Sequence, residues 1–474
     1  MNDAVSFFGE LTRLARQRPD HAALCYRVRS RIEHKTYRQA LGQVAACSQV
    51  FRNLPQKRVG ILGTNTWQWV CNAFGLLAAG KTVALLDPLL PEEDLIHAAE
   101  YTDLELLVAE EDSLPLAHTV QSALPGISVM AYHVAPETEQ LLELRSEWGG
   151  EIIFFTSGTT KHSKAVVTTL DAVAGQAKEQ QAVTQYEAGD LVMCPPPLHH
   201  AYGFSQLIFW FQVGCPIMIS AMKSVLADLR LIAPQRLMLV PSAARFLLDK
   251  GAFPQGLKSV ITAGSALPEE LAEGIRALGI AVQNQYGSSE YSGSIGENLP
   301  GDPIDKLTLH ESVTAEISPE GEVLVHTPYH FKEYYKDPDG TAATLRQGVI
   351  HTADAGVLDG QGRLRLLGRK KNMILMENGE KVFCQDVDRE LTALPFIGDA
   401  AVIYEDKQLI AVVAPQKGAS GEDVLASIAR YNKVQPYYRR IKHTWVYGNA
   451  LPYTSSGKLH RSRLEEEYRS QKSQ

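Results

Sequence analysis

A single loop of the sequence concentrates side chains that can hold phosphate groups. It follows an apolar run, residues 152–155, and reads Thr156-Ser157-Gly158-Thr159-Thr160-Lys161-His162-Ser163-Lys164. Hydroxyls and loop amides donate hydrogen bonds to phosphate oxygens, and Lys164 supplies a compact positive charge. The apolar run predicts a buried strand, and ligands of open α/β sheets bind where such strands end. The loop therefore predicts a site for a phosphate-bearing ligand, although a polar surface turn explains this segment equally well when it is taken alone.

Four other segments carry polar side chains suited to chemistry. In chain order they are Pro197-Leu198-His199-His200-Ala201-Tyr202-Gly203, Tyr286-Gly287-Ser288-Ser289-Glu290, His351-Thr352-Ala353-Asp354 with Gly368-Arg369 behind it, and Pro452-Tyr453-Thr454-Ser455-Ser456-Gly457-Lys458-Leu459-His460-Arg461. Three of them have a structural interpretation when taken singly: the Tyr286 segment as a turn entering a helix, Asp354 as the cap of a turn, and Lys458 as an exposed lysine. Their joint occurrence with the phosphate loop favours a functional interpretation.

The five segments together resemble the motifs of the adenylate-forming superfamily, which contains acyl-CoA synthetases, stand-alone adenylation domains and luciferases. The family's phosphate loop reads T-S-G-T-T-G-x-P-K-G. Its other motifs read P-L-x-H-x-x-G, Y-G-x-T-E, T-G-D with a later G-R, and P-K-T-x-S-G-K-I-x-R. All of them have counterparts here in the same order, from about residue 60 to the end of the chain. The resemblance implies an enzyme that activates a carboxylic acid with ATP as acyl-AMP and passes the acyl group to a thiol.

The resemblance implies roles for residues in the larger, N-terminal part of the chain. The residues that would cradle the leaving phosphates are Thr156, Ser157, Gly158, Thr159, Thr160 and Lys164. Glu290 would hold Mg²⁺, a hard cation that prefers carboxylate oxygen. Ser289 would bind the α-phosphate, and adenine would pack on Tyr286 beside Gly287 and Ser288. His200 would line the acyl pocket, and the wall between that pocket and adenine would be Gly264-Ser265-Ala266.

The resemblance also assigns roles to residues nearer the C-terminus. Asp354 would accept hydrogen bonds from the ribose hydroxyls, and Arg369 would add a ribose or phosphate contact. Lys371 falls at the family's hinge, about which a small mobile domain rotates after adenylation. Lys458 on that small domain would bridge the attacking carboxylate and the α-phosphate. The catalytic residues that the resemblance implies are Lys458, Lys164, His200 and Glu290.

The sequence departs from the family's motifs at four positions. Lys161 and Ala165 stand where the family usually has glycine, and Ser163 replaces its proline. Ala353 replaces the middle glycine of T-G-D. Because glycine permits positive φ angles and loop mobility, these changes bear on rate and nucleotide affinity more than on reaction type. They keep open the alternative of a nucleotide-binding protein that no longer catalyses a reaction.

The chain also carries information on the acid and its acceptor. Family members that activate α-amino acids pair the ammonium with an aspartate early in the histidine segment, and no carboxylate occurs here between Asp190 and Asp228. Because a buried, unpaired ammonium is costly, we expect an acid without an α-amine. Aromatic residues between 202 and 211 favour an aryl or fatty acyl group. The alternative is that residues 207–211 form a core helix, which is the simpler explanation for Phe209 to Phe211. The acceptor is coenzyme A or the phosphopantetheine arm of an acyl or aryl carrier protein. A basic stretch, residues 433–443, suits an acidic carrier, a nucleotide phosphate or a solvated surface.

A second phosphate-loop pattern is interpreted as a coincidence. Gly75-Leu76-Leu77-Ala78-Ala79-Gly80-Lys81-Thr82 matches G-x-x-x-x-G-K-[ST]. That motif works only when a strand precedes the loop and a helix follows it. Here a helical pattern precedes Gly80 and a strand pattern follows Lys81. We therefore expect a helix C-terminus capped by Gly80.

The elements that must position these motifs alternate in type. Helical patterns at residues 6–18, 38–51 and 67–79 alternate with apolar runs at 58–62, 83–86, 152–155, 237–240 and 260–262. Such alternation predicts an α/β fold with mostly parallel sheets flanked by helices. After about residue 300 the pattern changes to strands with turns, and the last ~100 residues look α+β. We predict a large multi-lobed N-terminal domain, residues 1–368, and a small C-terminal domain, residues 369–474.

The composition limits the class of protein. The chain has 474 residues, a net charge of −8, and 45% hydrophobic and 21% charged residues, which is the balance of a soluble globular protein. Binding to nucleic acid or anionic lipid through bulk charge would need the opposite sign. No apolar run is long enough to span a membrane. The six cysteines lie far apart, without a C-x-x-C pair, which is typical of a reducing compartment and predicts a cytoplasmic protein.

Overall fold

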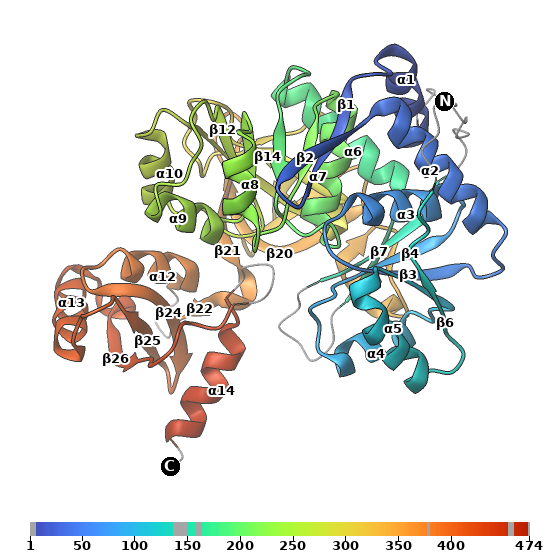
Figure 1. Ribbon diagram of the computed structural model, residues 1–474. Helices are drawn as coiled ribbons and strands as arrows, with labels where there is room; N and C mark the ends of the chain where they lie inside the picture. Colours follow the sequence, from blue (N-terminus) through green and yellow to red (C-terminus); the bar gives the residue numbers. More distant parts are fainter. Residues whose placement is uncertain (1–5, 136–148, 157–163, 377–379, 454–458, 473–474) are drawn as a thin grey trace. The chain divides into compact units, whose positions relative to one another are not determined.

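The computed structural model describes residues 6–135, 149–156, 164–376, 380–453 and 459–472. Of these residues, a larger compact unit contains 6–314, with its gaps, and 326–348, and a smaller unit contains 315–325 and 349–472. Figure 1 shows the chain coloured from its N-terminus to its C-terminus. Residues 315–325 and 349–368, which the sequence places in the N-terminal domain, lie in the smaller unit. The functional boundary at residue 369 stays a prediction.

The first sheet of the larger unit holds the strand before the phosphate loop. In spatial order its strands are β18 (Glu333–Tyr334), β8 (Ala165–Thr169), β7 (Glu151–Phe155), β4 (Thr82–Leu86), β3 (Arg58–Leu62), β5 (Leu106–Ala109) and β6 (Ser128–Ala131). The five strands from β7 to β6 run parallel, whereas β8 and β18 are antiparallel to their neighbours. The connecting helices are α3 (Trp67–Ala78), α4 (Glu92–Tyr101) and α5 (Leu114–Ala123).

The second sheet of the larger unit has nine strands. In spatial order they are β15 (Thr308–Leu309), β14 (Gly293–Glu297), β13 (Ala281–Ser288), β12 (Ser259–Thr262), β11 (Arg236–Leu239), β9 (Val192–Cys194), β10 (Ile217–Ile219), β1 (Ala22–Val28) and β2 (Arg31–Thr36). The strands from β13 to β1 run parallel, and antiparallel strands close both edges. The parallel core of both sheets agrees with the prediction from the apolar runs.

Helices cover these sheets and fill the space between them. They are α1 (Phe7–Gln17), α2 (Tyr37–Arg52), α6 (Leu170–Thr184), α7 (Ala201–Val213), α8 (Val225–Leu231), α9 (Pro241–Asp249) and α10 (Glu269–Arg276). After β15 and before the smaller unit's long strand come α11 (Pro338–Thr344) and β19 (Leu345–Arg346). Helix α2 begins with a capping box, in which Thr36 and Gln39 exchange hydrogen bonds between side chain and backbone.

The aromatic residues of α7 belong to the main hydrophobic core. Phe209 and Trp210 are fully buried and Phe211 is 2% exposed. The Phe211 ring lies 6.0 Å from Phe74 of α3, measured between ring centroids. Burial of large apolar side chains is the main favourable term in folding, so these rings stabilise the packing of α7 on α3. The core-helix interpretation of this run is confirmed, and its aromatic side chains no longer support an aryl or fatty acyl substrate.

The second phosphate-loop pattern has the structure expected of a helix end. Helix α3 ends at Ala78, Gly80 has a φ of +75°, and Thr82 begins β4. The Lys81 ammonium donates a hydrogen bond to the Leu54 carbonyl at 2.6 Å. Gly80 therefore caps a helix, as predicted, and Lys81 has a structural partner.

Among the described residues of the smaller unit, strands of one sheet precede residue 370, and a two-stranded sheet and a three-stranded sheet follow it. The first includes β16 (Thr314–Ile317), β17 (Glu322–His326), β20 (Val349–Leu358) and β21 (Leu364–Arg369), with β20 and β21 antiparallel. The later elements are β22 (Met373–Leu375), β23 (Lys381–Phe383), α12 (Cys384–Thr392), β24 (Ile397–Glu405), β25 (Gln408–Pro415), α13 (Gly421–Val434), β26 (Ile441–Val446) and α14 (Arg461–Lys472). Strands β24, β25 and β26 form a three-stranded sheet.

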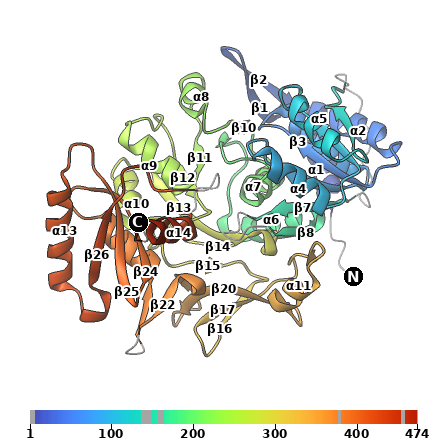
Figure 2. The same cartoon turned by 90° about the horizontal axis from the view of Figure 1, so that it is seen from below.

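Alternating residues of this three-stranded sheet build two cores. Val402 and Ala411 pack with α12 and α13, whereas Ala401 and Val412 pack with Leu464 of α14. Because side chains alternate between the faces of a strand, one helix pair covers one face and α14 covers the other. Figure 2 shows α13 beside this sheet. The last hundred residues therefore have the α+β character that the sequence predicts.

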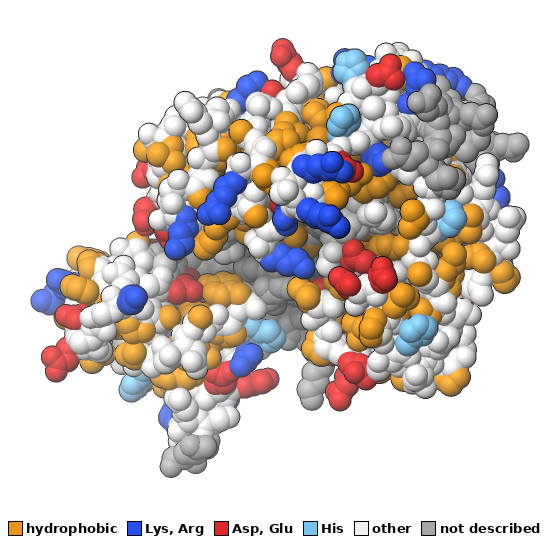
Figure 3. Space-filling view, in the orientation of Figure 1, with side chains coloured by type: hydrophobic (Ala, Val, Ile, Leu, Met, Phe, Trp, Pro, Cys, Tyr) orange, Lys and Arg blue, Asp and Glu red, His pale blue; other side chains and the backbone are white. Residues whose placement is uncertain are grey.

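The surface carries both signs of charge. On the face of the larger unit seen in Figure 3, lysine and arginine side chains gather near acidic ones. The net charge of −8 thus arises from mixed charges rather than from a uniformly acidic surface. Among the described residues, every helix is too short or too polar to cross a bilayer.

Candidate active site

The base of the predicted phosphate loop is closed by the β7–β8 hairpin. The Thr156 amide donates to the Lys164 carbonyl at 3.0 Å, and Phe155 lies opposite Ala165 in the ladder. This pairing places Thr156 and Lys164 side by side where β7 ends. The remaining predicted phosphate ligands, Ser157, Gly158, Thr159 and Thr160, lie outside the described residues.

Glu290 and Lys164 both contact Tyr334, one at its hydroxyl and the other over its ring. Glu290 lies in a short 3₁₀ turn, Ser289–Tyr291, which directly follows β13. The Tyr334 hydroxyl donates to Glu290 Oε1 at 2.8 Å. The Lys164 ammonium lies 4.0 Å from the centroid of the Tyr334 ring, a favourable cation–π distance. The fold thus brings the predicted phosphate-binding lysine and the predicted metal-binding carboxylate to one place.

Tyr334 is the residue of this cluster that the sequence analysis missed. It lies in the two-residue edge strand β18, which pairs with β8 next to Lys164. The Glu290 carbonyl also accepts a hydrogen bond from the Phe331 amide at 2.8 Å, so the same segment fixes the turn. No local pattern marks Tyr334, because its partners are brought to it only by the pairing of β18 with β8.

The strand before Glu290 requires glycine at position 287. A Cβ there would lie 2.3 Å from the Gly293 carbonyl oxygen, well inside van der Waals contact. Tyr286 is buried, and its hydroxyl lies 3.1 Å from the hydroxyl of Tyr291. Ser288 precedes the turn in an extended conformation. The close approach of β13 and β14 therefore determines where Ser289 and Glu290 lie.

The predicted wall residues follow the neighbouring strand, β12. Gly264, Ser265 and Ala266 are all exposed, and Gly264 has a φ of +91°, which favours glycine. They begin two residues after β12 ends, at the carboxyl side of the parallel strands. The Tyr202 hydroxyl donates to the Ile261 carbonyl at 3.2 Å and ties the start of α7 to this strand.

His200 belongs to a compact group that includes a distant aspartate. It precedes α7, and its ring centroid lies 4.6 Å from that of His199. His199 Nε2 lies 3.5 Å from Oδ2 of Asp87, which follows β4. Burial of the Asp87 carboxyl raises its pKa, but the contact with His199 and the hydrogen bond from the Leu89 amide outweigh burial and lower the pKa to about 2.

Asp87 qualifies the argument about an amine-bearing substrate. The two aspartates that bound the interval 190–228 both have partners: Arg236 for Asp190 and Arg27 for Asp228. Asp87 reaches the histidine segment from another sheet. Its position directly after a parallel strand is the signal that could have identified it. Asp87 thus brings a carboxylate to the histidine segment from outside residues 190–228, and it has His199 as its partner.

In the smaller unit, Asp354 and Arg369 form an ion pair across the β20–β21 ladder. Arg369 Nε lies 2.9 Å from Asp354 Oδ1, and Arg369 also donates to the Thr352 carbonyl at 3.0 Å. The Asp354 carboxyl is buried, whereas Arg369 is more exposed. Between Thr352 and Asp354, Ala353 has a φ of +56°, in the left-handed region. The site that the family fills with glycine thus retains the glycine-like conformation here.

The predicted hinge residue follows this ladder. Lys371 lies in a 3₁₀ turn, Lys370–Asn372, directly after β21. Its neighbour Lys370 forms an ion pair with Glu322 at 2.9 Å. Lys458 lies outside the described residues. Arg461 at the end of the same motif forms a buried ion pair with Asp388 of α12.

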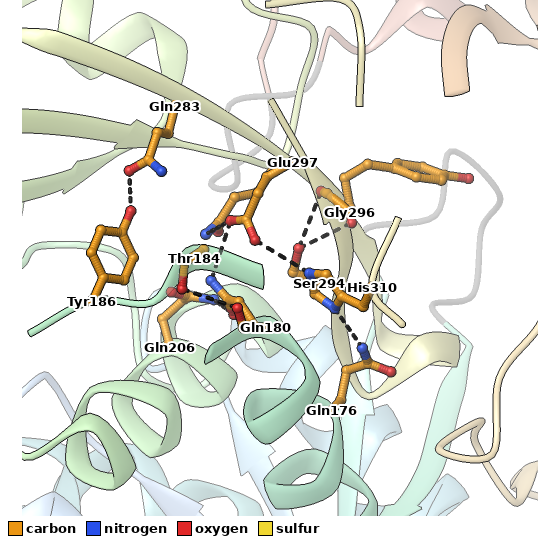
Figure 4. Close-up of polar contacts among 12 residues, drawn as sticks. Gln176, Gln180, Thr184, Tyr186, Gln206, Gln283, Ser294, Gly296, Glu297 and His310 are labelled. Carbon is orange, nitrogen blue, oxygen red and sulfur yellow. Dashed lines mark hydrogen bonds and ion pairs between the residues drawn. The ribbon is translucent and has the colours of Figure 1, made fainter. Parts of the chain in front are cut away.

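A buried polar network joins helix α6 to strand β14, the partner of β13 (Figure 4). His310 Nε2 lies 3.3 Å from Glu297 Oε1, and His310 Nδ1 lies 2.9 Å from the Gln176 amide nitrogen. Gln180 contacts Glu297 Oε2 at 3.5 Å. These contacts join α6 to β14, and leaving one buried partner without its hydrogen bond costs about 1–3 kcal/mol. The network thus stabilises the hairpin whose first strand leads to Glu290.

Residues 11–335 match the family model described as AMP-binding enzyme, which is more than half of the chain. The chain belongs to the AMP-binding enzyme family.

The relatives of this AMP-binding enzyme are CoA ligases. It is 26% identical to a propanoyl:CoA ligase of Mycobacterium tuberculosis whose acyl chain carries a methyl-dioxo-octahydro-indenyl ring, over 98% of this chain and 99% of that protein. It is 24% identical to a long-chain-fatty-acid–CoA ligase of Bacillus subtilis, over 96% and 93% of the two chains. The acyl groups named for these two relatives differ greatly in shape.

Two solved structures share the fold of this AMP-binding enzyme almost end to end. An anthranilate CoA ligase in complex with anthranoyl-AMP superposes with a TM-score of 0.89 at 18% identity, over 99% of this chain and 98% of that one. The o-succinylbenzoate CoA synthetase of Bacillus subtilis, bound to its acyl-adenylate intermediate, gives 0.82 at 20% identity, over 96% and 97%. The predicted family, the α/β fold class with a small C-terminal unit, and the class of acid–thiol ligases are confirmed.

Proposed function

We propose that the protein is an ATP- and Mg²⁺-dependent ligase that activates a carboxylic acid as acyl-AMP and transfers the acyl group to the thiol of coenzyme A. The observation that supports this most directly is the cluster of Lys164, Tyr334 and Glu290 beside the base of the phosphate loop. A cation, a carboxylate and a loop rich in hydroxyls are what a triphosphate with its metal requires. The CoA ligases among the relatives support the same reaction.

The first half-reaction needs charge stabilisation rather than a general base. A carboxylic acid is already ionised at neutral pH, so its oxygen attacks the α-phosphorus while the bond to the leaving pyrophosphate breaks. Lys164 and Thr156 would hold the leaving phosphates together with Ser157, Gly158, Thr159 and Thr160. Lys458 would lie between the carboxylate and the α-phosphate. Holding these anions together is the main contribution of the enzyme.

The Glu290 carboxylate fits a magnesium ion. Its oxygens are hard donors of the kind that Mg²⁺ prefers, and its Oε1 accepts from a neutral hydroxyl rather than from a cation. When bound, Mg²⁺ would neutralise charge on the phosphate oxygens. Ser289 would bind the α-phosphate, Tyr286 with Gly287 and Ser288 would form the adenine side, and Gly264-Ser265-Ala266 would separate adenine from the acyl group.

Residues of the smaller unit would hold the ribose and allow the enzyme to change from adenylation to thiol transfer. Asp354 would accept from the ribose hydroxyls while Arg369 keeps the carboxylate oriented. Lys371 would act as the hinge that exchanges the adenylating arrangement for the thiol-transfer arrangement. His200 would line the acyl pocket. The acid class that we propose, aryl or fatty acyl without an α-amine, is supported by the CoA ligases among the relatives rather than by the buried aromatic run of α7.

A carrier protein is the second candidate for the acceptor. In the smaller unit, Val434 and Tyr437 are 79% and 74% exposed, and the Lys442 ammonium lies 4.2 Å from the Tyr437 ring centroid. An exposed apolar surface with a cation beside it suits an acidic carrier that bears a phosphopantetheine arm. Arg439 of the same basic stretch is already paired with Glu390 at 2.8 Å.

The location that we propose is cytoplasmic. All six cysteines are free thiols and buried. Thiols of this kind are typical of proteins that remain in a reducing compartment.

Acid-dependent exchange of pyrophosphate into ATP, measured with a panel of aryl and aliphatic acids, tests the proposal. We expect exchange with at least one acid, followed by thioester formation when coenzyme A is added. A purified carrier that is acylated faster than coenzyme A would decide for the second acceptor. ATP binding by calorimetry without any exchange would instead indicate a non-catalytic protein.

The lysine of the terminal motif allows the half-reactions to be separated. Lys458→Ala should reduce adenylation at least 100-fold, because about 10²–10³-fold is typical for losing one transition-state donor. Thioester formation from supplied acyl-AMP should remain close to wild type. Equal losses in both half-reactions would contradict a role for Lys458 in adenylation alone.

A further inference from the structure

Three side chains outside the Lys164–Glu290 cluster converge in a manner suited to a metal ion. Asp87, His199 and His200 each offer one ligand atom, and these atoms lie within 4.8 Å of one another. Asp87 follows β4 of the seven-stranded sheet, and the two histidines precede α7. We propose that they form a binding site for a divalent transition-metal ion of the Zn²⁺ class, separate from the Mg²⁺ site at Glu290.

The distances are close to those of a coordination sphere. Zinc bonds to imidazole nitrogen and carboxylate oxygen are about 2.0–2.2 Å, which places neighbouring ligand atoms of a tetrahedron roughly 3.4 Å apart. His199 Nε2 and Asp87 Oδ2 are 3.5 Å apart already. The rings of His199 and His200 lie 4.6 Å apart between centroids, and a ligand atom of His200 lies within 4.8 Å of the other two.

Neighbouring hydrogen bonds orient the ligands before a metal arrives. Oδ1 of Asp87 accepts from the Leu89 amide at 2.9 Å, which directs Oδ2 toward His199. The histidine loop is held by Asn65, which accepts from the Leu198 amide at 2.8 Å and donates to the Pro196 carbonyl at 2.9 Å. Such outer contacts fix ligand geometry and increase metal affinity.

The donor types select the metal. Two imidazoles and one carboxylate suit Zn²⁺, Co²⁺ or Fe²⁺, whereas Mg²⁺ prefers oxygen ligands and water. Asp87 is 9% exposed and His199 is 8% exposed, so the bound ion would be largely shielded from bulk water. Three protein ligands also leave a fourth position open for water or an oxygen of a small molecule.

Cobalt binding to the full-length protein tests this site without ATP or an acid. After treatment with a chelator, Co²⁺ is added and the visible absorption of tetrahedral Co²⁺ is followed, with Zn²⁺ as the competitor. We expect one ion per chain, displaced by Zn²⁺ but not by Mg²⁺. His199→Gln should weaken Co²⁺ binding by at least about 10-fold, since even outer contacts of a metal site contribute that much.

A matched control and a second variant make the result decisive. His97→Gln replaces an exposed histidine of α4 and should leave Co²⁺ affinity unchanged. Asp87→Asn keeps the shape of the carboxyl, removes its charge and should also weaken binding; near-ultraviolet circular dichroism confirms that each variant is folded. No stoichiometric cobalt spectrum, or equal affinity in wild type, His199→Gln and Asp87→Asn, would overturn the proposal. Because no substrate is present, this result is independent of the proposed ligase activity.

Discussion

Two acidic residues assigned to the nucleotide are held in different ways. In the larger unit, Glu290 accepts from the neutral Tyr334 hydroxyl at 2.8 Å. In the smaller unit, Asp354 is paired with the Arg369 guanidinium at 2.9 Å. The hydroxyl does not offset the charge of Glu290, whereas the guanidinium offsets that of Asp354. This difference supports the proposal that Glu290 holds a metal cation and that Asp354 is an oriented acceptor for hydroxyl groups.

Removing the charge of Glu290 should have the largest effect on catalysis. Glu290→Gln keeps an oxygen that can accept from Tyr334 but loses the charge that attracts Mg²⁺. We expect exchange between pyrophosphate and ATP to fall by about 10²–10³-fold, the range for one electrostatic contributor to a transition state. Exchange is measured as a function of Mg²⁺ concentration. Glu333→Gln, which removes the charge of the exposed residue directly before Tyr334, is the control and should behave like wild type. If Glu290→Gln were as active as wild type, Glu290 would not be a ligand of the metal.

Removing the charge of Asp354 should have a smaller effect, expressed in ATP binding. Asp354→Asn weakens hydrogen bonds to the ribose that are worth about 1.5–3 kcal/mol when one partner is charged, which corresponds to roughly 10–150-fold in kcat/KM. The dependence on Mg²⁺ should be unchanged. Glu322→Gln breaks a comparable ion pair in the same sheet, with Lys370, and serves as the matched control. A shifted Mg²⁺ requirement in Asp354→Asn would contradict the division of roles.

The hydroxyl of Tyr334 should matter less than either carboxylate. Tyr334→Phe removes one hydrogen bond to Glu290 while the ring still faces Lys164. A hydrogen bond to a charged group contributes about 1.5–3 kcal/mol. Because the carboxylate keeps its charge when the hydroxyl is lost, we expect the loss of exchange to lie at the low end of that range, roughly 10-fold. Tyr334→Leu should reduce exchange further, because it also removes the ring from the Lys164 ammonium. Equal activities of the two variants would show that the cation–π contact contributes nothing.

The smallest change concerns the conformation next to Asp354. Ala353→Gly relieves a left-handed backbone conformation that costs an alanine about 1–2 kcal/mol, and part of that gain is lost to the greater freedom of glycine in the unfolded chain. We expect the smaller unit to be more stable by about 0.5–1 kcal/mol in urea. Ala355→Gly, in the same strand without a positive φ, should instead destabilise it. Stabilisation of both variants would mean that φ at residue 353 is not the cause.

Local patterns predicted the elements well, because periodicity and apolar runs act within a few residues. Strand β3 has the predicted bounds, and helix α3 differs from its prediction by one residue. The motifs also pointed to Lys164 and Glu290, which both contact Tyr334, and to Asp354 and Arg369, which form an ion pair. Contacts over long sequence separations could not be read in this way. Tyr334 reaches Glu290 through an edge strand, and Asp87 reaches His199 from another sheet.

Aromatic composition was the least reliable guide to the site. The run from Phe209 to Phe211 has the residue types of an acyl pocket, yet the fold directs it into the main core. A helix that is apolar on most of its surface is usually buried between other elements, and α7 follows that rule. The polar residues of α6 and α7 that face β14 have no counterpart among the predicted features.

The central claim is that this chain makes acyl-AMP with a metal held by Glu290. The most direct measurement is pyrophosphate exchange into ATP with the acid panel, carried out in parallel on wild type and Glu290→Gln. The account predicts exchange that depends on one class of acid and on Mg²⁺, and that falls by about 10²–10³-fold in the variant. Wild-type protein that binds ATP but supports no exchange with any acid, or a variant as active as wild type, would contradict it.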